Sequence, residues 1–369
     1  TILFFSFCLC LVIIMLRSRI MHLMIRRSDL NSVQSMHTRE TPRVGGIAVF
    51  GAIGLGAIFS SVSISSAYTD FVLFSSLLFF VGLAEDLGFK ISPRNRLLAA
   101  ASSSLLIIWV LGFWLPRTGF PILDTVIDHW AVGIPLTVLV TVGISNGFNL
   151  IDGVNGLASF TGIVAALALS QIAEVSGYPT MAHLSILIGA GILGFFIVNY
   201  PFGLIFLGDA GAYTIGFVLS WIGIVILINI PDVSPWAILL TLFWPVADTL
   251  LAIYRRSRRG LNVCAPDRLH VHQIIMRGLE ICFFGKNCRH ITNPLTTLVM
   301  SPLIISPPIV GILLWDQNWN AFLAVLFFCL LLFAGYFYAP KLIWQFRRKS
   351  YRDSNTVAVI TIRKLKKIL

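Results

Sequence analysis

The stretch Asn146-Gly-Phe-Asn-Leu-Ile-Asp-Gly-Val-Asn-Gly-Leu157 lies between two long apolar segments, 131–145 and 157–173. Within it, polar side chains recur at every third position: Asn146, Asn149, Asp152 and Asn155. On a helical or turn-like backbone this spacing keeps the four groups near one side. The glycines between them let a ligand approach the backbone closely. The stretch predicts a site for a polar ligand or a metal–phosphate group, with a polar turn between two helices as the simpler alternative.

The composition is that of an integral membrane protein. The 369 residues are 57% hydrophobic and 12% charged, and the mean hydropathy is +0.88, which excludes an ordinary soluble domain. A spanning helix needs about 20 apolar residues. We therefore predict an all-α, polytopic fold of about eleven transmembrane helices, at 2–16, 45–63, 71–84, 97–115, 131–145, 157–173, 183–199, 210–229, 234–254, 294–314 and 319–340.

The first apolar segment begins at Ile2 without an initiator Met, a basic flank or a small-residue cleavage site. We expect it to be a true span, with further residues upstream of the numbering, and not a signal peptide.

The net charge of +11 reflects membrane topology and not nucleic-acid binding. Of the 27 Lys and Arg residues, only Arg117 lies outside four segments that alternate spans place on one side: 17–44, 85–96, 255–292 and 341–369. The positive-inside rule puts these segments in the cytosol, with the N-terminus outside and the C-terminus inside. The same parity places 146–156 and 200–209 on the cytosolic face.

We predict one membrane domain, residues 1–340, followed by a basic cytosolic tail at 341–369 that forms an amphipathic surface segment on the lipid bilayer. The active-site loops are expected at 17–44, 85–96, 146–156, 200–209 and 255–292.

Three further carboxylates fall on the cytosolic side. Glu85 and Asp86 end the third span, and Asp209 begins the eighth. A carboxylate at a membrane edge is costly unless it is solvated, paired or bound to a metal. We interpret the three as functional; the simpler readings are solvation for the acidic pair and an N-cap for Asp209.

Basic and imidazole groups face the same side. Arg43 precedes Gly45 and Gly46, where it can meet a phosphate or snorkel at a helix start. Arg268, His270 and His272 stand together, and on an extended backbone all three would face one ligand. We prefer phosphate contact to a zinc site with Cys264, because one Cys and two His do not close a structural site. Asp248 is interpreted as structural, paired with Arg255 or Arg256.

These motifs together resemble the polyprenyl-phosphate N-acetylhexosamine-1-phosphate transferases, glycosyltransferase family 4. The resemblance is carried, in chain order, by Thr41–Gly46, Glu85-Asp86, Asn149–Gly156, Phe206–Gly211 and His270–His272. The sequence departs from the usual family pattern at Glu85, where Asp is usual, at Ala212, where Ser is usual, and at Gln273, where another His is common. The His-Val-His form favours the antigen or exopolysaccharide branch over the peptidoglycan branch.

The resemblance implies transfer of a sugar 1-phosphate from a UDP-N-acetylhexosamine to undecaprenyl phosphate, with release of UMP, at the cytosolic face of the bacterial inner membrane. It implies Mg²⁺, with Mn²⁺ as an alternative, because two anions must meet. Asp209 and Asp152 are the expected ligands. Asp86 and Glu85, with Asp152, are the expected catalytic groups, and the expected substrate contacts are Asn146, Asn149, Asn155, Arg43, Arg268, His270 and His272.

Three alternatives remain from the sequence. The nearest is the same chemistry on UDP-N-acetylmuramoyl-pentapeptide. A transporter or flippase would place its polar groups near the bilayer midplane instead. A non-catalytic scaffold would leave five polar motifs on one face unexplained. The sequence alone does not identify the sugar, and it is compatible with a homo-oligomer.

Overall fold

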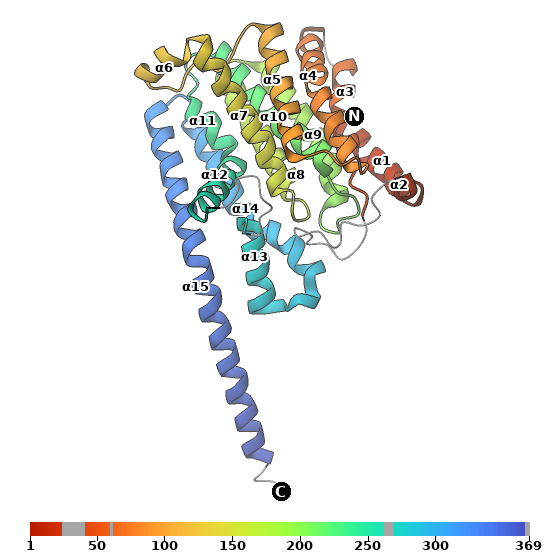
Figure 1. Cartoon of the computed structure of the whole chain (residues 1–369), viewed down its shortest axis with the longest axis vertical. Coiled ribbons are helices and arrows are strands. Elements are labelled where there is room, and N and C mark those ends of the chain that lie inside the picture. The colour runs from red at the N-terminus through yellow and green to blue at the C-terminus, as the bar shows by residue number, and fades with distance from the viewer. Residues whose placement is uncertain (24–40, 60–61, 261–268, 366–369) are drawn as a thin grey trace.

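A computed structural model describes residues 1–23, 41–59, 62–260 and 269–365. Within these ranges the protein is a bundle of helices without a strand (Figure 1), which confirms the predicted all-α class. The α-helices are α1 (Ile2–Met15), α2 (Arg17–Leu23), α3 (Gly46–Phe59), α4 (Val62–Asp86), α5 (Pro93–Leu111), α6 (Pro121–Ile127), α7 (Trp130–Ile151), α8 (Leu157–Val175), α9 (Pro179–Asn199), α10 (Gly208–Asn229), α11 (Pro235–Thr241), α12 (Phe243–Arg258), α13 (Val271–Leu279), α14 (Arg289–Leu313) and α15 (Asn318–Leu365).

The described helices account for a multi-pass membrane protein. Seven of them are long and apolar enough to cross a bilayer, or eight if the bent pair α11 and α12 forms one span. Two shorter apolar helices, Ile2–Met15 and Gly46–Gly56, lie among the described residues as well. The count of eleven spans stays a prediction.

Helix α10 forms the centre of the bundle. Its residues are apolar on every side, the pattern of a fully enclosed helix, and every residue from Gly208 to Leu227 is buried. It packs against α3, α4, α7 and α8. Because α10 starts at the site described below, its surroundings hold that site in place.

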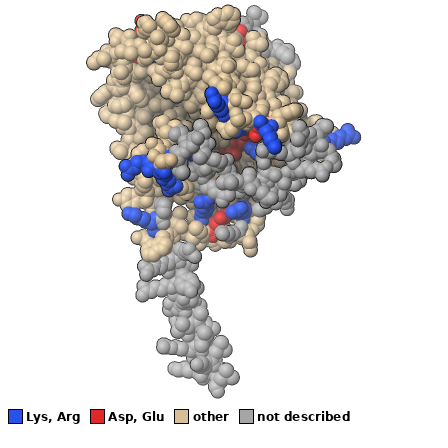
Figure 2. All heavy atoms as spheres, viewed as in Figure 1, with Lys and Arg blue, Asp and Glu red and all other residues tan. Residues whose placement is uncertain are grey.

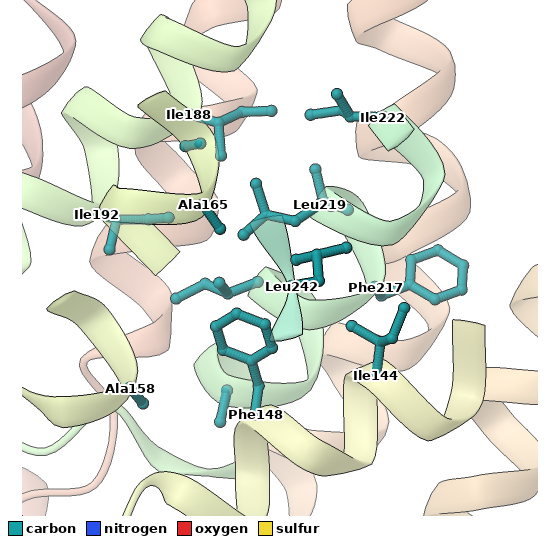
Figure 3. Close-up of a cluster of buried hydrophobic side chains, with 14 of the residues drawn as sticks. Ile144, Phe148, Ala158, Ala165, Ile188, Ile192, Phe217, Leu219, Ile222 and Leu242 are labelled. Atoms are coloured by element: carbon teal, nitrogen blue, oxygen red, sulfur yellow. The ribbon is translucent and has the colours of Figure 1, made fainter. Parts of the chain in front are cut away.

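The core between α7, α8, α9 and α10 consists of aliphatic and aromatic side chains. Figure 3 shows Phe148 and Ile144 from α7 facing Phe217 and Leu219 from α10. A Cβ atom built at Gly216 would lie 2.8 Å from the Cα of Ser145, so this glycine allows α7 and α10 to approach closely. The Ser145 hydroxyl donates to the Tyr213 carbonyl over 2.7 Å and adds a polar contact between the same two helices.

The C-terminal end of α10 is capped by Arg117, the basic residue that the topology places alone on the far side. Its guanidinium donates to the carbonyls of Leu227 (2.6 Å), Ile230 (2.9 Å) and Val233 (2.6 Å). Leu227 lies in the last turn of α10, where carbonyls lack intrahelical partners and carry the negative end of the helix dipole, Ile230 is the C-cap, and Val233 lies in the connection that follows. Arg117 therefore stabilises the end of α10 opposite the candidate site.

The predicted span at 234–254 is not one straight helix. It is divided into α11 and α12, which meet at 85°. The break is at Leu242, whose N–H turns back to the Leu239 carbonyl over 3.1 Å. Pro245 follows in the first turn of α12 and has no N–H to offer the Thr241 carbonyl, so the helix cannot continue straight.

Two helices run further than the sequence indicated. Helix α7 continues to Ile151, so Asn146 and Asn149 are helical and only the end of the expected 146–156 loop is a turn. Helix α15 is continuous from Asn318 to Leu365, so the expected tail extends this helix and does not form a separate segment (Figure 1). Between these helices, the expected 255–292 loop contains the end of α12, α13 and the short helices Glu280–Phe284 and Lys286–Cys288.

Candidate functional site

The N-terminus of α10 is surrounded by carboxylates from two other helices. The two side-chain oxygens of Asp86, at the end of α4, accept the backbone N–H groups of Asp209 and Ala210, each over 2.9 Å. Asp152, which caps the C-terminus of α7, accepts the N–H of Gly208. The first N–H groups of a helix have no partner within it and carry the positive end of its dipole. The two carboxylates thus bind this helix end and fix its position.

Glycines on α3 and α4 allow the backbones of these helices to approach the start of α10 closely. A Cβ built at Gly82 on α4 would lie 2.6 Å from the Cα of Ala210. A Cβ at Gly46 would lie 2.7 Å from the Cα of Gly211. Both positions require glycine because any side chain would push α3 or α4 away from the start of α10.

The segment before α3 runs beside the segment before α10. The Phe206 N–H donates to the Pro42 carbonyl over 2.9 Å, and the Phe206 carbonyl accepts the Gly45 N–H over 2.9 Å. The Gly46 N–H completes the pairing with the Leu207 carbonyl at 2.8 Å. This pairing brings Arg43 to the carboxylates, although it is far from them in sequence.

Asp209 projects from the first turn of α10 and meets two arginines. Its Oδ1 lies 3.8 Å from Nη2 of Arg43, and its Oδ2 forms an ion pair with Arg96. The Asp209 side chain is 7% exposed and that of Arg96 15%, whereas Arg43 is 42% exposed. The guanidinium of Arg96 also lies 5.9 Å from the ring centroid of Tyr213. The two cations offset the cost of burying Asp209.

The pKa of Asp152 is shifted by its surroundings. Burial raises its pKa to about 7, and the charge of Arg43 and the hydrogen bond from Gly208 only partly oppose this shift. A buried carboxylate of this kind gains most from an added cation, which favours its charged form.

The amides of α7 approach the same place through Tyr213. The Tyr213 hydroxyl donates to Oδ1 of Asn146 over 3.3 Å and forms a second hydrogen bond with the Asn149 side chain. Tyr213 thereby connects the amides of α7 to Arg96 and Asp209. Both amides lie at the candidate site and are half-buried.

Asn155 has a different environment. Its Nδ2 donates to the Pro201 carbonyl over 2.8 Å, and its backbone N–H donates to Oδ1 of Asn293 over 2.7 Å. The Thr297 hydroxyl donates to its carbonyl over 2.7 Å. These bonds hold the turn after Asp152 against α14 and against the turn that precedes α10. One atom, Oδ1, is buried and lacks a partner among the described residues.

The two histidines lie against this turn. His270 is the N-cap of α13 and His272 lies in its first turn; both are buried, and their rings stack with centroids 5.8 Å apart. A Cβ added at Gly153 would collide with Nε2 of His272. The His pair therefore packs beside Asp152, but through a helix start and not through the extended strand considered from the sequence.

Asp248 binds His270 and not the arginines that the sequence suggested. Its Oδ2 lies 2.6 Å from Nδ1 of His270, and its Oδ1 accepts the Val271 N–H over 3.2 Å. The break before α12 turns that helix toward α13, so the helix-spaced pairing with Arg255 or Arg256 is replaced by a contact between two helices.

Glu85 and Arg268 complete the predicted set. Glu85 accepts the Ile91 N–H over 2.6 Å at the turn between α4 and α5. Arg268 lies outside the described residues. Conversely, Arg96 and Tyr213 contact the site although the sequence analysis did not name them, and Asp248, interpreted there as structural, binds His270. The position of Arg96 in the first turn of α5, the helix that follows the Glu85-Asp86 pair, could have indicated that it lies near the site.

The site fits a divalent cation. Within the described ranges there is no group of three His, Cys, Asp or Glu side chains that would enclose a metal ion. Mg²⁺ normally takes one or two carboxylates and completes its shell with phosphate and water oxygens. Asp209 and Asp152 offer two carboxylates, and Asp209 is held between Arg96, which pairs with its Oδ2, and Arg43, whose Nη2 lies 3.8 Å from its Oδ1. On the face in Figure 2, the Lys and Arg atoms lie toward the end from which α15 extends, with acidic atoms in a recess between them.

The chain is similar in sequence to a family of glycosyl transferases. The sequence profile described as glycosyl transferase family 4 matches residues 68–227. A Bacillus subtilis protein named "Probable undecaprenyl-phosphate N-acetylglucosaminyl 1-phosphate transferase" is 28% identical over 67% of this chain and 69% of its own length. The Mycobacterium tuberculosis decaprenyl-phosphate N-acetylglucosaminephosphotransferase is 28% identical over 66% of this chain and 67% of its own length. The Yersinia pestis undecaprenyl-phosphate alpha-N-acetylglucosaminyl 1-phosphate transferase is 28% identical over 68% of this chain and 69% of its own length. The chain is therefore similar to glycosyl transferase family 4 over residues 68–227, and to polyprenyl-phosphate N-acetylglucosaminyl 1-phosphate transferases, the group that its motifs resemble.

Proposed function

We propose that this protein transfers N-acetylhexosamine 1-phosphate from a UDP-sugar to undecaprenyl phosphate and releases UMP. One observation carries the proposal: Asp86, Asp152 and Asp209, from three separate helices, meet at the start of α10 together with Arg43 and Arg96. The relatives are named as undecaprenyl-phosphate N-acetylglucosaminyl 1-phosphate transferases, and the proposal takes its lipid phosphate and its sugar phosphate from them.

In the proposed reaction an oxygen of the lipid phosphate attacks the β-phosphorus of the UDP-sugar. The bond from that phosphorus to the bridging oxygen breaks, and UMP leaves with the bond electrons. A phosphate monoester is already largely dianionic near pH 7, since its second pKa is about 6. A general base is therefore not required, and the task of the protein is to bring two anions together.

The residues of the site match that task. Arg43, the more exposed of the two arginines, supplies positive charge where the lipid phosphate approaches. Arg96 holds Asp209 and Tyr213 in place. Asn146 and Asn149 orient the nucleotide from α7, and His270 and His272 contact the pyrophosphate from the start of α13.

Mg²⁺ belongs to this proposal, with Asp209 and Asp152 as the residues that would hold it. When bound, the ion supplies positive charge to the phosphate oxygens and to the departing UMP. Asp86 contributes by fixing the backbone of Asp209 and Ala210, since each of its oxygens accepts one of these two N–H groups.

We also propose that the site faces the cytosol of a bacterial inner membrane. Four segments hold all Lys and Arg residues except Arg117. In Figure 1, α6 lies at the end of the bundle opposite α13, and Arg117 lies near α6 in sequence. The positive-inside rule then places α13 and the carboxylates on the cytosolic side, where UDP-sugars are made.

The experiment is a transfer assay with the purified protein, undecaprenyl phosphate, Mg²⁺ and a panel of UDP-sugars. The expected result is a lipid product whose mass equals the acceptor plus one N-acetylhexosamine 1-phosphate, with one UMP per product. Asp128→Asn, at an exposed residue in the α6–α7 connection, is the matched control and should keep full activity. Failure to form any lipid product from the whole panel would overturn the proposal.

A further inference from the structure

The buried contact between Asp248 and His270 connects α12 to the start of α13. Both side chains are 2% exposed, and Oδ2 of Asp248 lies 2.6 Å from Nδ1 of His270. The other carboxylate oxygen accepts the Val271 N–H over 3.2 Å. Asp248 therefore binds both the ring of His270 and the backbone immediately after it, which fixes the ring relative to the start of α13.

The second nitrogen of the ring remains available. Nε2 of His270 is buried and has no hydrogen-bond partner among the described residues. A buried polar atom without a partner costs about 1–3 kcal/mol, so its retention calls for a ligand. The ring stacks on His272, which in turn packs against Gly153 beside Asp152. The His270 ring is thus separated from the turn after Asp152 by one stacked imidazole, that of His272.

We infer that Asp248 is a positioning residue that holds His270 with Nδ1 engaged and Nε2 presented to a phosphate oxygen of the nucleotide-sugar. This inference rests on the proposed function. The carboxylate accepts a hydrogen bond from Nδ1–H, which leaves Nε2 for the substrate, and a hydrogen bond from Nε2 to a phosphate oxygen requires that Nε2 also carries a proton. In its doubly protonated form the ring donates Nδ1–H to Asp248 and Nε2–H to the ligand. A histidine without this partner can rotate or exchange tautomers, and its Nε2 is then no longer aligned with the phosphate oxygen.

Asp248→Asn is the informative substitution because it separates packing from orientation. The amide has nearly the same shape as the carboxylate but only one acceptor oxygen. If this oxygen keeps the bond to the Val271 N–H, the amide NH₂ group faces Nδ1 of His270, which must then give up its proton. The helix start is preserved while the tautomer of His270 is reversed.

The first measurement is a double-mutant cycle in the transfer assay, with Asp248→Asn, His270→Gln and the double variant. We expect each single substitution to lower kcat by about 100-fold, the size typical for loss of one positioned polar contact to a reacting group. In the His270→Gln background, Asp248→Asn should cost less than about twofold further, because Asp248 acts through His270. An unchanged 100-fold cost in that background would overturn the inference. Asp232→Asn, at an exposed carboxylate, is the matched control.

The second measurement does not depend on activity. A ¹⁵N spectrum of histidine-labelled protein in nanodiscs, with the His270 signals assigned by their loss in His270→Gln, reports which ring nitrogen carries a proton. The wild type should show Nδ1 protonated, and Asp248→Asn should move the proton to Nε2. A spectrum of His270 that Asp248→Asn leaves unchanged would overturn the inference, even if the wild type proved inactive with every sugar nucleotide and the proposed function failed.

Discussion

Asp86 accepts the backbone N–H of Asp209 over 2.9 Å, so the acidic residue that ends α4 fixes the acidic residue that begins α10. Its second oxygen accepts the Ala210 N–H at the same distance. The contact explains why two carboxylates that are costly to bury lie together. One satisfies the helix end, and the other is held facing Arg43 and Arg96.

Asp86→Asn should therefore reduce both activity and stability. The amide retains one acceptor and turns an N–H donor toward a second backbone N–H, so Asp209 loses its fixed position. We expect transfer to fall by at least about 100-fold and the free energy of unfolding to fall by about 1–3 kcal/mol. The assay and a thermal melt in detergent measure the two effects. Normal transfer with the protein present at its usual level would contradict this role.

Arg96→Lys tests the ion pair with Asp209. Lysine keeps the charge but loses the planar guanidinium that pairs with the carboxylate and lies over Tyr213. We expect kcat/KM to fall by about tenfold, equal to about 1.4 kcal/mol. Arg94→Lys on the same helix, at an exposed residue, should have no effect and serves as its control. Equal activities of the two variants would argue against a role for Arg96.

Gly153→Ala tests the packing of the histidines against the turn after α7. The added methyl group would collide with the His272 ring, so the ring must move away from Asp152. We expect transfer to fall by about tenfold or more, the order seen when a group is displaced by about 1 Å at a reacting centre. Gly143→Ala, on α7, meets no atom within 4 Å and should leave activity unchanged. If both variants behave alike, His272 is not constrained by this turn.

His272 gives the folded protein a defined pH dependence. Burial lowers the pKa of His272 from 6.5 to about 4. The folded state thus favours the neutral ring, and this contribution to stability is complete above pH 6.5 and is lost as the pH falls toward 4. The melting temperature of the wild type should decline more steeply over this interval than that of His272→Gln. Parallel declines would mean that His272 does not titrate as a buried neutral group.

The sequence predicts the site better than it predicts the helix ends. The motifs around Asp86, Asp152 and Asp209 indicated one acidic site. Hydropathy could not reveal the 85° break at Leu242, because an apolar segment reads the same whether it runs straight or turns. It also could not show that α7 continues through Asn149, since polar residues at a three-residue spacing suit a helix or a turn.

Partner choice was the part least accessible from the sequence. Asp248 lies seven and eight residues from two arginines on its own helix, and helix spacing favours such a pair. It nevertheless binds His270 at the start of α13. Arg96 reaches Asp209 because α4, α5 and α10 pack together. Such contacts depend on the tertiary arrangement, and no local pattern encodes them.

The central claim is that Asp86, Asp152 and Asp209 form one transferase site at the start of α10. The most direct measurement compares purified wild type with Asp209→Asn in the presence of undecaprenyl phosphate, UDP-N-acetylglucosamine and Mg²⁺, with the lipid product identified by mass. The account predicts undecaprenyl-diphospho-N-acetylhexosamine and UMP from the wild type, and at most about 1% of that rate from Asp209→Asn. Equal product formation by the two proteins would contradict it.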